Sequence, residues 1–111
     1  MGFSVETTPN DVIVVGVAGQ LIVGNRHELK QKILDALDSG SRKFVIDFSA
    51  TEYIDSSGLG VLVTLSKKIT ESEGEIRLAA LNDDLRTLFE LTKLDTLFEL
   101  YDSVEAAADG F

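Results

Sequence analysis

The feature that most constrains this chain is an apolar run that leads, through a short polar loop, into a helical pattern. Residues 44–48 (Phe-Val-Ile-Asp-Phe) are typical of a buried strand, and residues 61–65 begin a helical pattern that ends near Gly74. Between them lies the loop 55–58 (Asp-Ser-Ser-Gly). α/β proteins place binding sites beyond the carboxyl ends of strands and at the amino ends of helices. We therefore expect the functional site at this loop.

The first part of the chain has the pattern of a β-hairpin. Residues 3–8 alternate apolar and polar side chains, which predicts a half-exposed strand at a sheet edge. Residues 9–11 (Pro-Asn-Asp) have the chemistry of a turn. Residues 12–17 are nearly all β-branched, which predicts a strand that is covered on both faces.

The rest of the chain alternates helical and strand patterns. We expect residues 19–25 to be a connection and Asn25 to cap a first helix that stops at residues 39–41 (Ser-Gly-Ser). A central strand follows over residues 42–48. After the second helix we expect a short strand over residues 75–80, a third helix capped by Asn82, a strand over residues 96–100 and a small helix over residues 103–109 capped by Ser103 or Asp102.

This order of elements, β-β-α-β-α-β-α-β-α, predicts an α/β fold. A leading hairpin followed by βα units gives a mixed β-sheet with four helices packed against it. The 111 residues leave room for one domain, which would span residues 1–111.

The charge of the chain limits its partners. The sequence has 19 Asp and Glu against 10 Lys and Arg, a net charge of −9 that is spread along its length. Nucleic-acid backbones and anionic membranes would repel such a chain, so we expect neither as a partner. A protein with a basic face is the better match, although solubility alone is the simplest role of the charge.

The chain contains no cysteine, so it has no disulfide framework and no thiolate metal site. No apolar run approaches the ~20 residues of a membrane span, and no basic segment precedes an apolar one near the amino end. We expect a cytoplasmic protein that needs no cofactor.

The serine loop lacks the partners of a catalytic site. A serine hydrolase has a glycine two residues before its nucleophile, where this chain has Ile54 before Ser56. The single histidine, His27, lies on the charged face of the first helix and is expected to be a solvated surface residue. Without a general base beside the serine, we expect no catalytic residues and no enzyme activity.

Nucleotide and metal motifs are incomplete. Gly58 and Gly60 supply two glycines of a dinucleotide-binding fingerprint, but Val63 stands in place of the third. Three acids between residues 47 and 55 have no histidine or cysteine near them. A magnesium site made of carboxylates alone is therefore a weak alternative.

A serine at the amino end of a helix can simply cap it, a role worth about 1 kcal/mol. Two serines, an acid and two glycines exceed that need, because Gly58 and Gly60 would each cost a helix about 1 kcal/mol. Their lack of side chains would leave the first turn open to another molecule. A phosphoryl group, with about −1.5 to −2 charges, suits a helix amino end and would alter any surface pressed against it. The residues alone leave both roles open and do not separate Ser56 from Ser57.

The motif Asp-Ser-Ser-Gly-Leu-Gly at residues 55–60, placed after a buried strand, resembles the signature of bacterial anti-sigma factor antagonists, the single-domain STAS proteins. The resemblance extends over essentially the whole chain. Gly19, Gln20 and Leu21 stand where the family has a Gly-Glu-Leu-Asp turn, and residues 91–98 resemble the closing segment of the family.

The resemblance implies a phosphorylation switch. In the family, the unphosphorylated antagonist binds an anti-sigma factor that is also an ATP-dependent serine kinase, and thereby frees a sigma factor. The kinase then phosphorylates the serine that corresponds to Ser56, the complex separates, and a serine phosphatase restores the serine. The implied partner-binding residues are Gln20, Leu21, Asp55, Ser56, Ser57, Gly58 and Gly60.

The chain departs from the family in the turn that the family places beside the serine loop. Gln20 replaces a glutamate and Ile22 replaces the closing acid. Two charges expected at the partner face are therefore missing. The alternative function is a constitutive STAS scaffold, or a small-ligand-binding module, in which Ser56 is only a cap.

Overall fold

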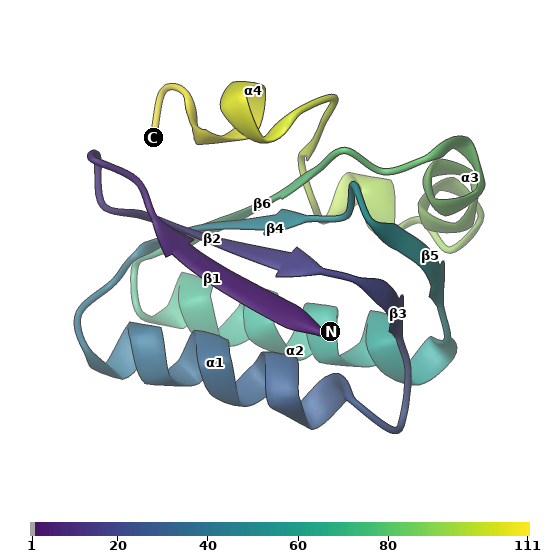
Figure 1. The fold of residues 1–111 in the computed structure, drawn as a ribbon, viewed down its shortest axis with the longest axis horizontal. Helices are drawn as coiled ribbons and strands as arrows, with labels where there is room; N and C mark the ends of the chain where they lie inside the picture. The colour runs from purple at the N-terminus through teal and green to yellow at the C-terminus, as the bar shows by residue number, and fades with distance from the viewer. Residues whose placement is uncertain (1) are drawn as a thin grey trace.

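A five-stranded mixed sheet forms the centre of the protein, seen in a computed structural model that describes residues 2–111 (Figure 1). The first two strands form the predicted antiparallel hairpin, and every later strand is parallel to its neighbour. The predicted α/β fold with a mixed sheet is therefore confirmed. The strands are, in their order across the sheet, β1 (Phe3–Thr7), β2 (Val12–Val17), β4 (Lys43–Asp47), β6 (Glu75–Ala79) and β7 (Leu100–Tyr101).

Helices cover both faces of this sheet. α1 (Arg26–Asp38) and α2 (Ser56–Glu71) lie side by side on one face, while α4 (Val104–Ala108) lies on the other (Figure 1). α3 (Asp83–Leu91) lies at one end of the molecule. The four predicted helices are present, and the predicted caps of the last two, Asn82 and Ser103, accept hydrogen bonds from Leu85 N–H and Ala106 N–H.

Two short strands are missing from the sequence prediction. β3 (Gly19–Leu21) and β5 (Thr51–Ile54) pair in parallel as a separate two-stranded sheet. The prediction of a plain connection over residues 19–25 is wrong, because a strand of three residues is too short to show alternation. The two central residues of β5 are both exposed, so β5 does not show the alternation of a strand either and resembles a loop in sequence.

The predicted last strand is present, but its predicted bounds, residues 96–100, are wrong. Leu94–Thr96 form a 3-10 helix, and only Leu100 and Tyr101 pair with β6. Lys93, at φ 65°, turns the chain out of α3, and the buried Phe98 follows soon after. Phe98 therefore serves the core rather than a strand ladder, whereas Leu97 is 50% exposed.

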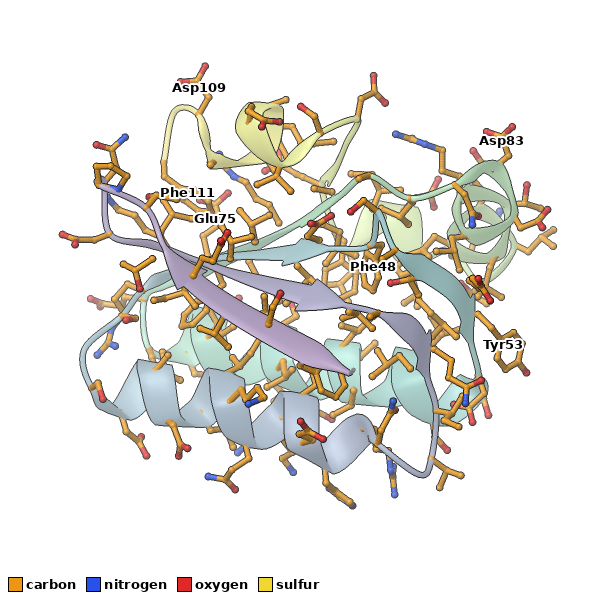
Figure 2. All side chains as sticks on the ribbon, in the orientation of Figure 1. Phe48, Tyr53, Glu75, Asp83, Asp109 and Phe111 are labelled. Carbon is orange, nitrogen blue, oxygen red and sulfur yellow. The ribbon has the colours of Figure 1, made fainter. Side chains whose placement is uncertain are left out.

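The main core lies between the sheet and the pair α1 and α2, and it extends toward α3 through three aromatic rings. The ring centroid of Phe89 lies 6.5 Å from that of Phe48 and 6.2 Å from that of Phe98. Figure 2 shows Phe48 in the interior of the molecule. These rings fix α3 to the rest of the fold.

A buried arginine attaches the carboxyl-terminal segment to the opposite face of the sheet. Arg77, on β6, is only 8% exposed and donates to the carbonyl oxygens of Ala107 and Asp109, both at 2.9 Å. It also pairs with Glu75, and its guanidinium lies 3.8 Å from the ring centroid of Phe111 (Figure 2 labels both partners). A cation at the carboxyl end of α4 matches the negative end of the helix dipole.

The aromatic cluster gives a first testable prediction. Phe89→Ala should lower the free energy of unfolding by about 3–5 kcal/mol, because it removes a fully buried ring between two others and leaves a cavity. Urea denaturation monitored by circular dichroism measures this change. The control is Leu91→Ala on the same helix, which is 77% exposed and should change stability by less than about 0.5 kcal/mol. Equal effects of the two substitutions would contradict this description of the core.

Candidate functional site

The serine loop lies beside the turn that follows β3. Leu21 pairs with Ile54 in the small sheet, and Asp55 N–H donates to Leu21 O at 3.1 Å. Gln20 and the start of α2 are thus neighbours in space, as the family resemblance implies. The side chain of Leu21 is 0% exposed, however, so the expectation that it contacts a partner is wrong for its side chain. Leu21 positions the loop through its backbone oxygen and its buried side chain, both of which lie next to Gly58.

Asp55 caps α2 and joins it to the neighbouring turn. Its backbone is extended, and its Oδ1 accepts from Gly58 N–H at 2.8 Å. Its Oδ2 accepts from Val23 N–H at 3.1 Å, 32 residues earlier in the chain. The interpretation of a serine as the cap is therefore wrong. A carboxylate has two acceptor oxygens, so Asp55 can accept from α2 with one and from the neighbouring turn with the other, whereas a serine has a single hydroxyl oxygen.

Asn25 provides a second link in the same turn. Its Oδ1 accepts from Ile22 N–H at 2.9 Å, and its Nδ2 donates to Gln20 O at 2.8 Å. Asn25 occupies the N-cap position of α1, as predicted, but its side chain makes no cap hydrogen bond to that helix. Asn25 and Asp55 together hold the turn over residues 22–25 against the start of α2.

The two serines occupy the first two positions of α2 and differ in exposure. Ser56 is exposed and Ser57 is half-buried. Within residues 2–111, neither hydroxyl takes part in a hydrogen bond. The first N–H groups of a helix also lack intrahelical partners, so this turn offers free donors beside an exposed hydroxyl.

The two glycines of the motif have different roles. Gly58 is buried, and a Cβ there would lie 2.5 Å from Leu21 O and 2.9 Å from the side chain of Ile54. A Cβ on Gly60 would meet nothing within 4 Å. The expectation of an open first turn therefore holds for Gly60 and is wrong for Gly58, whose missing side chain allows α2 to pack against β3.

The glycines provide a matched pair of substitutions. Gly58→Ala should lower the free energy of unfolding by about 1–3 kcal/mol, since its methyl group would overlap a backbone oxygen. Gly60→Ala should raise it by about 0.5–1 kcal/mol, because alanine is the better helix former and the space is open. Thermal unfolding measures both shifts. A stabilising Gly58→Ala would contradict the close approach of α2 to β3.

Tyr53 is an exposed aromatic residue beside the serine loop, and it is not among the candidate site residues predicted from the sequence. It lies on β5 with 56% of its surface exposed, and Figure 2 shows it projecting outward from the end of the molecule. A large aromatic residue two positions before a polar loop is the signal in the sequence. It did not identify Tyr53, because buried and binding aromatics look alike in sequence.

The alternative sites have less support from the geometry. Asp47 Oδ1 accepts from Ser49 N–H within the connection after β4, and His27 is an exposed residue of α1. Among residues 2–111, no group of three or more His, Cys, Asp or Glu side chains is placed to hold a metal ion. In the same part of the chain, no helix has the length and hydropathy needed to cross a membrane.

Comparison with known proteins agrees with this geometry. The family model of the STAS domain matches residues 3–107, and the chain therefore belongs to the STAS domain family. The anti-sigma-B factor antagonist of Staphylococcus aureus is 29% identical over 106 residues, which cover 95% of this chain and 98% of that protein.

Solved structures give the same result for the fold. The crystal structure of an anti-sigma factor antagonist from Mycobacterium paratuberculosis is 30% identical, covers 95% of this chain and 88% of its own, and superposes with a TM-score of 0.84. The Bacillus cell fate determinant SpoIIAA, in its phosphorylated form, shares the fold with a TM-score of 0.77 at 21% identity, over 97% of each chain.

Proposed function

We propose that this chain is an anti-sigma factor antagonist whose binding is switched off by phosphorylation of Ser56. The unphosphorylated form binds an anti-sigma factor that is also a serine kinase, and so releases a sigma factor. A serine phosphatase restores the binding form. The names of the S. aureus and M. paratuberculosis relatives support the first part of this proposal.

The observation that supports the switch is that Asp55, and not Ser56, provides the cap of α2. Because Asp55 caps α2, the exposed hydroxyl of Ser56 is not needed to hold the helix. A kinase can therefore modify it without removing a structural hydrogen bond. Exposure also favours Ser56 over the half-buried Ser57 as the acceptor.

A phosphate on Ser56 would change the partner surface more than the fold. It adds about −1.5 to −2 charges at the amino end of α2, where the helix dipole favours an anion. A partner pressed against this turn would have to strip water from that charge, which is costly unless it supplies cations in the right places. The antagonist itself needs no catalytic residue and no cofactor, since the partner binds the ATP.

The alternative function is a constitutive STAS scaffold or a small-ligand module. The exposed Gln20 and the half-buried Ile22, which bring no charge to the turn beside Ser56, favour it. Its premise that Ser56 serves only as a cap is lost, because Asp55 has that role.

The switch can be tested by measuring binding and phosphorylation of this protein with each purified kinase-type anti-sigma factor of the source organism. Ser56→Asp should weaken binding about tenfold or more, because it places a charge within the contact. Ser56→Ala should bind normally, accept no phosphate from labelled ATP and remain bound in its presence, whereas Ser57→Ala should still be phosphorylated and released.

The control for the added charge is Ser103→Asp, at the cap of α4 on the other side of the sheet. Aspartate can also accept the cap hydrogen bond, so this variant should bind as the wild type does. Release of Ser56→Ala by ATP, or unchanged binding of Ser56→Asp, would contradict the proposed switch.

A further inference from the structure

An open groove of about 510 Å³ lies next to the serine loop, between β5, the start of α2 and α3. Five apolar side chains contribute to its lining: Tyr53, Ile54, Leu59, Leu85 and Leu88. Ile54 and Leu85 are almost fully buried, whereas Tyr53 remains 56% exposed. The groove therefore presents apolar surface to solvent beside a firmly packed core.

The charged residues that line this groove are all acidic. Glu52 comes from β5, Asp55 from the serine loop and Asp84 from the first turn of α3. No lysine or arginine is among the lining residues. An apolar surface with carboxylates around it is complementary to a segment that has apolar side chains flanked by cations.

Ser56 lines the same groove, so the proposed phosphorylation site and this surface are continuous. We propose that the groove docks an apolar segment of the anti-sigma factor that is flanked by lysine or arginine residues. This inference rests on the proposed function and adds the surface and the chemistry of the partner. The apolar side chains of that segment would lie against Tyr53 and Leu88, and its cations would face Asp84 and Glu52.

The α3 side of the groove provides a test that does not touch the serine loop. Asp84→Lys should weaken binding of the purified anti-sigma factor about three- to tenfold, mainly through slower association, because exposed charges act on encounter. The difference from wild type should shrink when the salt concentration is raised, since salt screens exposed charges. The matched control is Asp83→Lys, which changes the same charge in the same helix turn outside the groove lining.

A second pair tests the apolar part. Tyr53→Ala should weaken binding about tenfold through faster dissociation, because large aromatic residues dominate interface energies. Val5→Ala, on the exposed edge strand β1, removes a similarly exposed apolar side chain and should leave binding unchanged. Circular dichroism of each variant confirms that differences in binding do not arise from unfolding.

The outcomes separate this inference from the proposed function. Loss of binding in Ser56→Asp, together with wild-type affinity in both Asp84→Lys and Tyr53→Ala, would overturn the groove and leave the switch standing. Equal losses in Asp84→Lys and Asp83→Lys would overturn the groove as well, since they would reflect overall charge. A wild-type protein that binds none of the anti-sigma factors would overturn both.

Discussion

The carboxylate of Asp55 is the contact on which the site depends. One oxygen holds the first turn of α2 and the other holds the turn after β3, so two segments 32 residues apart form one surface. The backbone of the same residue donates to Leu21 O and continues the pairing of the small sheet. Because the acid carries these structural duties, the exposed hydroxyl of Ser56 is available for chemistry. Gly58 allows the close packing that this arrangement needs.

A basic partner and a phosphate on Ser56 would attract each other, yet the proposed phosphate ends binding. The relative sizes of the two free energies explain why the phosphate weakens binding. Exposed ion pairs around a groove contribute about 0–1 kcal/mol each. Removing water from a doubly charged group against apolar side chains costs on the order of several kcal/mol unless it is fully paired. The acids around the groove would therefore mainly guide association, while the state of Ser56 would decide whether the apolar contact can form.

Much of the fold could be predicted from the sequence, and the failures have physical causes. Sequence patterns identified the four helices and the first four strands of the main sheet, but they misplaced the last strand, β7. The strand-to-helix junction identified the loop with Ser56. Sequence could not choose Asp55 over the serines as the cap, since all are good caps and the choice depends on a distant N–H group. β3 and β5 were too short to show a pattern. The groove arises only when α3 packs beside β5, a long-range contact that no local pattern encodes.

Phosphorylation of Ser56 can be tested by mass spectrometry of this protein purified from its own cells, before and after the cells are stressed. We expect a single phosphate on Ser56 whose occupancy changes between the two conditions. It would be contradicted by the absence of phosphate under every condition, or by phosphate on Ser57 with none on Ser56.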